Sequence, residues 1–285
     1  MSILFKNTLF VFLAIFSFWA IAEDEKESKK EENKTEMQAN LVEKCRDKDC
    51  LSEKFKSAKT AVEKNVIIEE YCLEIADEKE QEKVCSEAAL ILIAGNEKER
   101  IKPDYLRAIK LLDVACNNKQ HDISAISCTL LASIYQKGEG VVKKDAKKAE
   151  KYLEIGCKKE ELSSCVQLAE QFNRQGKMMQ ADKIYKNNLN GFNQACENNI
   201  SDYCYLLGNI YAKAMGVEKN SDKAMDFYLK SCKKDKENTA RYCYAVAEKL
   251  LNGENIQKDE AKARELFKIA CENGEITACA KQGAK

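Results

Sequence analysis

The sequence predicts an all-α protein: an αα-hairpin solenoid that is stapled by disulfides and coils as a right-handed superhelix. Three observations predict this fold. Cysteines recur in pairs at a nearly constant period, apolar residues between them follow helical spacing, and helix-breaking residues are few. The 285 residues include 14 cysteines, one proline and 11 glycines. A repeat of roughly 20 to 50 residues is typical of solenoids.

The cysteine pairs define the repeat. From the second pair onward, the first cysteines of successive pairs are 44, 41, 39, 36 and 39 residues apart, and the second cysteines are 43, 37, 39, 39 and 36 apart. Three pairs share the frame C-x7-C, as in "ACENGEITAC" near the end of the chain. We therefore expect about six helix pairs in residues 44–285.

The unit after Cys128 shows the expected order of elements. Its first helix has a stripe of apolar residues at helical spacing. Gly138 and Gly140 then permit the positive φ of a tight turn, and Asp145 can cap the second helix. The two apolar stripes are Leu130, Leu131, Ile134 and Tyr135 on the first helix, and Ala149, Tyr152, Leu153 and Gly156 on the second.

Other copies repeat this pattern. Gly253 and Asp259 mark the turn and cap of the last copy, and Pro103 marks a helix start in the earliest, where proline is tolerated. The inward stripes of the second helices are Ala108, Leu111, Leu112 and Ala115, then Ala224, Phe227, Tyr228 and Ser231, and finally Ala263, Leu266, Phe267 and Ala270.

The run "LLASIYQKGEGVVKKDAKKAEKYLEIGC" resembles a Sel1-like repeat, a relative of the tetratricopeptide repeat (TPR-like). With the paired cysteines added, residues 45–285 are similar to the Helicobacter cysteine-rich protein family of exported Sel1-like repeat proteins. Two units depart from the pattern. The unit from Cys165 to Cys196 lacks the G-x-G of the turn and is closer to a tetratricopeptide hairpin. The short segment from Cys50 to Cys72 predicts an atypical N-terminal cap, with Lys64 at the inward alanine position.

Each cysteine pair spans the connection between the end of one helix and the start of the next. Side chains near such a turn can reach the ~5.5 Å Cα separation of a disulfide, so sequential pairing is geometrically easy. The resemblance implies the same connectivity for the repeated pairs, whereas no matching repeat surrounds the first pair. The expected bridges are Cys45–Cys50, Cys72–Cys85, Cys116–Cys128, Cys157–Cys165, Cys196–Cys204, Cys232–Cys243 and Cys271–Cys279.

The N-terminal residues predict export. Lys6, an apolar run from Leu9 to Trp19 and a small-x-small triplet ending at Ala22 are typical of a signal peptide over residues 1–22. Residues 23–43 are charged and lack hydrophobic periodicity, which predicts a disordered leader. We expect a periplasmic or secreted protein, where disulfides persist.

The resemblance also implies an enzymatic alternative, because the Helicobacter cysteine-rich family carries a β-lactamase label for penicillin binding or weak β-lactam hydrolysis. Serine β-lactamases need S-x-x-K, S-D-N and K-T-G elements. Only the first occurs, from Ser231 to Lys234, and Ser231 lies on an inward stripe. We therefore name no catalytic residue.

Other chemistries are disfavoured. His121 is the one histidine and no C-x2-C pair occurs, so we expect no zinc site, no redox-active dithiol and no cofactor. The charges balance at 47 basic and 47 acidic residues, which argues against a nucleic-acid partner. We also expect no membrane association once the signal peptide is removed, and a monomer.

The remaining function is binding. Stacked helix pairs curve into an extended concave face, and we expect a protein or peptide partner there. The candidate residues come from the first helix of each unit: Gln136, Gln167, Gln171, Asn209, Lys213, Tyr244 and Glu248. Two N-x-S/T motifs preceded by an acidic residue also predict glycosylation at Asn33 and Asn199.

Overall fold

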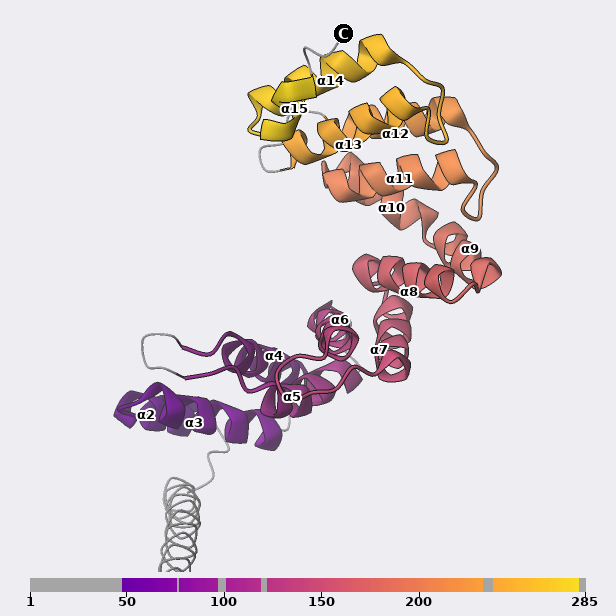
Figure 1. Cartoon of the computed structure of the whole chain (residues 1–285). Helices are drawn as coiled ribbons and strands as arrows, with labels where there is room; N and C mark the ends of the chain where they lie inside the picture. Colours follow the sequence, from indigo (N-terminus) through magenta and orange to yellow (C-terminus); the bar gives the residue numbers. More distant parts are fainter. Residues whose placement is uncertain (1–47, 76, 97–100, 119–121, 233–237, 282–285) are drawn as a thin grey trace, which may run out of the picture. The chain divides into compact units, whose positions relative to one another are not determined.

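The computed structural model describes residues 48–75, 77–96, 101–118, 122–232 and 238–281. Within these ranges the regular secondary structure is helical, apart from one isolated bridge between Asn96 and Ile101, so the all-α prediction is confirmed (Figure 1). The predicted signal peptide and leader, and with them Asn33, Cys45, His121 and Lys234, lie outside the described residues.

The chain divides into two compact units, of which the first ends at Val114. Its helices are α2 (Lys48–Ser57), α3 (Ala61–Glu74), α4 (Glu78–Ala94) and most of α5 (Tyr105–Asn117). Thr60 and Glu63 form a reciprocal capping box that starts α3. Pro103 is not at a helix start as expected: it lies in the segment before α5, which begins two residues later.

The second unit, Ala115–Lys285, carries the regular hairpins α6–α7, α11–α12 and α13–α14. Its helices are α6 (Asp122–Lys137), α7 (Ala146–Lys158), α8 (Leu162–Arg174), α9 (Met178–Asn187), α10 (Leu189–Glu197), α11 (Ser201–Lys213), α12 (Ser221–Ser231), α13 (Thr239–Asn252), α14 (Glu260–Glu272) and α15 (Ile276–Lys281).

The turn glycines and the helix caps of the hairpins lie where the sequence predicted them. Gly138 and Gly140 adopt φ of 73° and 58°, which glycine reaches without strain. Asp145 accepts two backbone N–H groups at the start of α7, and Asp259 caps α14 in the same way through one. Such caps satisfy donors that have no partner within the helix.

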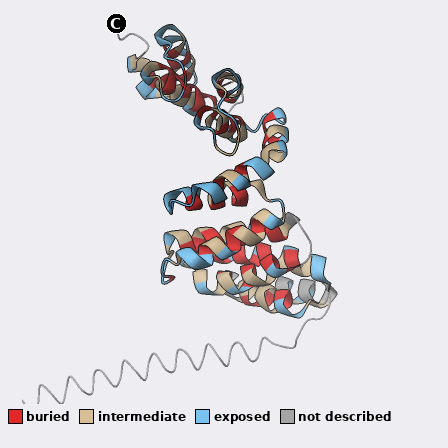
Figure 2. Ribbon diagram, turned by 90° about the vertical axis from the view of Figure 1, so that its right-hand side faces the viewer, coloured by how far each residue is buried: buried red, intermediate tan, exposed pale blue. Residues whose placement is uncertain are grey.

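The core of each unit is the set of facing inward stripes (Figure 2). Every residue of the stripe on α7 is buried, as is every residue of the stripe on α14. On α12 Phe227 is half-buried, and its ring stacks on Tyr211 instead of filling the core. Gly208 lets α12 approach α11 closely, since a Cβ there would lie 2.4 Å from the ring of Tyr228.

The unit between Cys165 and Cys196 differs from the regular hairpins. Its second helix is interrupted at Asn188, which ends α9 and begins α10. The side-chain amide of Asn188 donates to the carbonyl of Ile184, a local bond that competes with helix continuation. Phe192 of α10 is fully buried, so the extra segment packs on the core.

The described residues contain six disulfides, and they join the six repeated pairs in the predicted sequential order. Their Cα separations run from 4.6 to 5.0 Å, within the normal range. Each links the end of one second helix to the first helix that follows. Cys50 is also disulfide-bonded, but its pairing with Cys45 stays a prediction.

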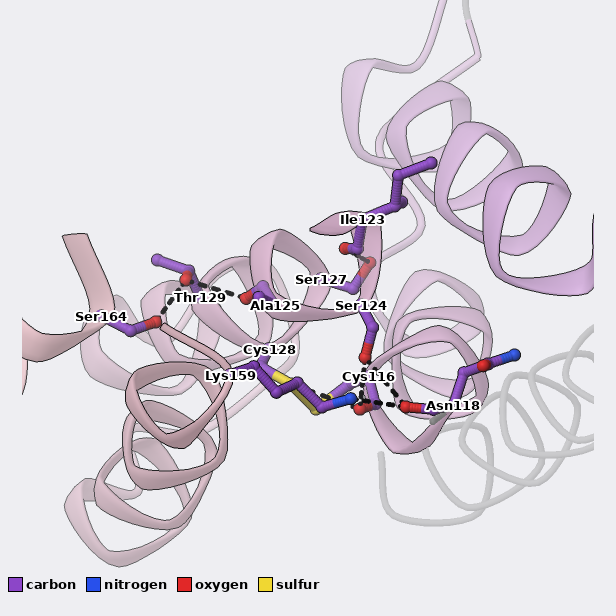
Figure 3. Close-up of a disulfide and its surroundings, with 10 residues drawn as sticks. All are labelled: Cys116, Asn118, Ile123, Ser124, Ala125, Ser127, Cys128, Thr129, Lys159 and Ser164. Atoms are coloured by element: carbon purple, nitrogen blue, oxygen red, sulfur yellow. Dashed lines mark hydrogen bonds between the residues drawn. A yellow bond between two sulfur atoms is a disulfide. The ribbon is translucent and has the colours of Figure 1, made fainter. Parts of the chain in front are cut away.

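Figure 3 shows one such junction, Cys116–Cys128. The buried Ser124 donates from Oγ to the carbonyl oxygens of Cys116 and Asn118, at 2.9 and 3.2 Å. Lys159, which follows α7, donates from Nζ to the same Asn118 oxygen. These carbonyls close a helix and have no intrahelical partner, so the junction is held by hydrogen bonds as well as by the disulfide.

Candidate ligand groove

A groove of about 770 Å³ lies in the second unit, across the first helices of three successive repeats. Each of these helices contributes side chains to the lining. The lining residues are Ser163, Val166, Gln167 and Glu170 of α8, then Asp202, Tyr203, Tyr205, Leu206 and Asn209 of α11, and finally Arg241, Tyr242 and Ala245 of α13.

These residues share positions relative to the second cysteine of their repeat. Positions −2, +2 and +5 fall on one side of an α-helix, because successive residues are rotated by about 100°. Stacked repeats therefore place the same positions side by side. They are Ser163, Asp202 and Arg241 at −2, then Gln167, Leu206 and Ala245 at +2, and Glu170 and Asn209 at +5.

Tyrosine rings form the middle of the groove. The ring centroid of Tyr205 lies 5.5 Å from that of Tyr228 and 5.1 Å from that of Tyr242, spacings at which aromatic pairs attract. Tyr203 stacks on Phe192 of α10 at 5.8 Å. The segment that interrupts the regular hairpin pattern thus supports one wall of the groove.

Tyr228 orients Asn209. The Tyr228 hydroxyl donates to Oδ1 of Asn209 at 2.9 Å. Burial raises the pKa of the Tyr228 hydroxyl, so that it stays protonated and acts as a donor. With its oxygen occupied, the Asn209 amide can offer its N–H groups to a ligand carbonyl.

A buried lysine lies behind this wall. Lys249 of α13 is 7% exposed, and its Nζ is 3.1 Å from the Glu254 carboxylate. The same Nζ lies 5.9 Å from the ring centroids of both Tyr205 and Tyr228. The hydrogen bond to Lys249 is the main reason that the pKa of Glu254 is lowered. This cation therefore lies within cation–π distance of both rings.

The groove is polar but carries few charges. Burial, and then the nearby carboxylates of Glu161 and Asp202, raise the pKa of Tyr203 to about 12, so its hydroxyl is neutral at physiological pH. The Tyr242 hydroxyl donates to Asp202, and Arg241 lies over the Tyr242 ring at 5.3 Å. Amides, hydroxyls and rings of this kind suit hydrogen bonding and stacking with an uncharged main chain.

The structure brings together two of the predicted partner residues, Gln167 and Asn209, which both line the groove. Tyr244 and Glu248 lie further along α13, where Lys281 of α15 donates to Glu248 at 2.6 Å and covers the Tyr244 ring at 5.4 Å. The bond to Glu248, followed by one to Tyr244, raises the pKa of Lys281. Lys213 is exposed at the end of α11.

Gln171 corrects the sequence prediction, whereas the half-buried Gln136 stays a prediction. Gln171 is buried at 6% exposure, and its amide donates to the Ala146 carbonyl at 3.0 Å and to Glu150 at 3.1 Å. Gln136 donates to its side-chain oxygen at 3.4 Å. Gln171 directly follows Glu170 of the groove lining. Its side chain faces α7, so its amide joins α8 to α7 and is not available to a partner.

Sequence reasoning missed the tyrosines, Asp202 and Arg241. The signal that could have found them was the cysteine register, because positions −2 to +2 around the second cysteine carry all of them. The interpretation instead took polar residues at other positions of the first helices, of which only Gln167 and Asn209 line the groove.

The residues considered for other chemistry have local roles. Ser231 is fully buried and donates from Oγ to the Tyr228 carbonyl at 2.7 Å, so its hydroxyl is not accessible to a β-lactam. Asn199 is exposed in the turn after α10, with φ of 64°. Over the described ranges, no group of three or more His, Cys, Asp or Glu side chains could hold a metal ion. None of the helices described there is long and apolar enough to cross a membrane.

Four segments of the chain match the family model of the Sel1 repeat: residues 93–119, 125–160, 201–236 and 240–275. The irregular segment that contains α9 and α10 lies between the second and third matches. No curated protein sequence is significantly similar to the chain. The Sel1 part of the predicted resemblance is confirmed, while the narrower resemblance to the Helicobacter cysteine-rich family and its β-lactamase label stays a prediction.

A solved structure shows the same fold. A protective antigen present in uropathogenic Escherichia coli strains, which displays an SLR fold, aligns with a TM-score of 0.57 at 16% identity over 79% of this chain and 44% of the other. The chain thus spans less than half of that structure. A Sel1 repeat protein from Oxalobacter formigenes is 19% identical over 73% of this chain and 76% of the other, with a TM-score of 0.48.

Proposed function

From the premise that this chain belongs to the Sel1 repeat family, we propose that it is an exported scaffold that binds an extended segment of a protein partner in the groove formed by α8, α11 and α13. Sel1 repeat proteins are in general protein-interaction scaffolds. The observation that carries the proposal is the repeated register: equivalent positions of successive repeats line one continuous surface.

The groove's chemistry supports a main-chain ligand. Asn209 offers amide donors, Gln167 offers an amide in the preceding repeat, and Tyr205 provides a flat ring. An extended chain presents a carbonyl on each side every two residues, which suits polar groups repeated along neighbouring helices. We propose that this groove is part of the concave face of the solenoid and that the chain acts as a monomer.

Export is the second part of the proposal. Six disulfides in the described part of the chain support a periplasmic or extracellular location, since reducing compartments keep thiols reduced. Cell fractionation followed by thiol labelling tests this part. Protein that is recovered mainly in the cytoplasm with reactive thiols would contradict it.

A peptide selection tests the groove. Ala245 is a small lining residue on α13, and Ala261 is a small exposed residue on α14 outside the groove. We expect a random peptide library to yield the same binders with the parent chain and with Ala261→Trp, and none of them with Ala245→Trp, whose indole fills the groove. Binders that tolerate Ala245→Trp, or no binders at all, would overturn the proposal.

A further inference from the structure

The segment from Val141 to Lys158, which comprises the α6–α7 turn and α7, differs in charge from its counterparts. It carries six lysines against three carboxylates. The equivalent segment Gly216–Lys233 carries four lysines against three carboxylates, and Asn255–Glu272 carries four basic residues against four carboxylates. All six lysines of the first segment are exposed: Lys143, Lys144, Lys147, Lys148, Lys151 and Lys158. We call this set the basic face.

The carboxylates of the segment are mostly engaged elsewhere. Asp145 accepts the cap hydrogen bonds from the backbone of Lys147 and Lys148. Glu150 accepts from Gln171 of α8 at 3.1 Å and from Gln175, directly after α8, at 2.9 Å. Glu154 remains on the outer side of α7 among the lysines. The net positive charge is therefore directed outward.

The lysines of the basic face are not neutralised by ion pairs. In the part of the chain that the structure describes, none of them has a carboxylate oxygen within 4.0 Å. On α14 the corresponding cations are paired, as in Lys262–Glu265 at 2.8 Å. An unpaired cluster of this size attracts an anionic surface, and polybasic segments of four to eight residues are typical of binding to anionic lipid.

Val141 adds an apolar tip beside these charges. It is 76% exposed, whereas its neighbour Val142 is buried at 9%. Counted back from the capping residue, Val142 corresponds to Val217 and Ile256, and Val141 to Gly216 and Asn255. Neither counterpart of Val141 is a large apolar residue, and the exposed Val141 side chain lies in the turn that carries Lys143 and Lys144.

We propose that the basic face docks on an anionic lipid bilayer, with Val141 entering the interface between headgroups and acyl chains. Lysines on a helix with an apolar residue at the contact suit an interfacial site, and each lysine near an anionic surface changes partitioning by about fivefold. Nucleic acid is a poorer fit, because the face has no arginine and no exposed aromatic ring for stacking bases. This surface is separate from the groove, and it departs from the expectation that the mature chain avoids membranes.

Vesicle binding tests the proposal. The chain beginning at Glu23 is used in oxidised form, so that apolar residues 9–19 cannot bind lipid themselves. We expect co-sedimentation with vesicles that contain phosphatidylglycerol and not with pure phosphatidylcholine, and weaker binding as salt is raised, since salt screens exposed charges. The variant Lys143→Glu/Lys147→Glu/Lys151→Glu should lower partitioning by at least about 100-fold.

A matched control variant and a fluorescent probe test whether vesicle binding depends on the basic face or on positive charge anywhere on the chain. Lys219→Glu/Lys223→Glu/Lys230→Glu makes the same charge change in the α11–α12 repeat and should bind nearly as the parent does. Trp19 is the one tryptophan of the chain, so Val141→Trp places a single tryptophan at the tip when residues 1–22 are absent. Its emission should shift to the blue with phosphatidylglycerol vesicles.

Three outcomes would overturn the proposal. These are equal binding to both kinds of vesicle, equal loss in the two triple variants, and vesicle binding without an emission shift at position 141. Binding to RNA or an anionic polysaccharide without vesicle binding would also overturn it, and would assign the face to a polyanion.

Discussion

The α11–α12 hairpin and the α8–α10 segment perform the same structural task with different lengths of chain. In the hairpin, 20 residues separate Cys204 from Ala224 of the second helix, and eight more reach Cys232. In the segment, 16 residues separate Cys165 from Ala181, and 15 more reach Cys196. The turn is shorter and the second helix is longer and interrupted.

The difference shows what a repeat must conserve. Although the second helix breaks at Asn188, the cysteine at the end of α10 still reaches the first helix of the next repeat. It forms its disulfide with Cys204 of α11 at a Cα separation of 4.7 Å, as Cys232 does with Cys243. Side chains of α8, α11 and α13 still line one groove, although the second helix of this unit differs in length and continuity.

The largest expected effect concerns the inserted segment. Phe192→Ala should lower the free energy of unfolding by about 3–5 kcal/mol, because Phe192 is fully buried and stacks on Tyr203. Phe227→Ala in α12 should cost less, since Phe227 is only half-buried. Urea unfolding of the oxidised chain measures both. Equal losses of unfolding free energy in the two variants would show that Phe192 stabilises the fold no more than the half-buried Phe227 does.

A disulfide deletion comes next. Cys196→Ala/Cys204→Ala opens a loop of eight residues and should cost about 2.5 kcal/mol in the chain-entropy model. Cys271→Ala/Cys279→Ala opens a loop of the same length but should cost less. The reason is that α15 buries one residue, Ala278, and can detach without unfolding its neighbours. Thermal unfolding of both double variants checks this order, and a larger cost at α15 would contradict it.

Two glycines provide a finer comparison. Gly208→Ala should cost about 1–3 kcal/mol, because the new Cβ would lie 2.4 Å from the buried Tyr228 ring. Gly191→Ala in α10 would meet only the end of the Leu162 side chain, at 2.8 Å, which can rotate away. We expect that variant to be nearly neutral in chemical denaturation. A substantial loss in Gly191→Ala would mean that Leu162 is fixed.

Tyrosine ionisation should have the smallest effect on the free energy of unfolding near neutral pH. Burial, followed by the charges of Glu170 and Asp182, raises the pKa of Tyr185 in α9 to about 12, compared with 10 in the unfolded chain. Its contribution to stability is therefore fully present below pH 10 and is lost as pH rises through 12. Tyr185→Phe should reduce the fall in unfolding free energy between these values. An unchanged pH profile would show that Tyr185 ionises freely in the folded chain.

Much of the fold followed from local signals in the sequence. Gly138, Asp145 and Asp259 have the predicted roles because turns and caps depend on a few neighbouring residues. The interruption at Asn188 was not predicted, because residues 178–197 continue a helical pattern and the competing bond from the Asn188 amide depends on conformation. Pro103 was misplaced by two residues for a similar reason, since helix ends depend on which cap forms.

The groove was predicted only in part. Asn209 and Gln167 were found because they are polar residues on the outward side of the first helices. Gln171 satisfied the same criterion, yet it faces α7 and is buried. Periodicity locates the buried stripe of a helix, but the remaining surface is shared between a neighbouring helix and a ligand, and only stacking of the repeats separates the two.

The disulfides also determine how the molecule would transmit a pulling force. Each one connects the end of a repeat directly to the first helix of the next, so tension bypasses the connecting loop. A loop of eight residues, such as the one closed by Cys157 and Cys165 at a Cα separation of 4.6 Å, would otherwise release about 23 Å of chain when stretched, at about 3.4 Å per residue. A partner that pulls on one end would therefore extend the hairpins themselves, one at a time, while the junctions between repeats hold.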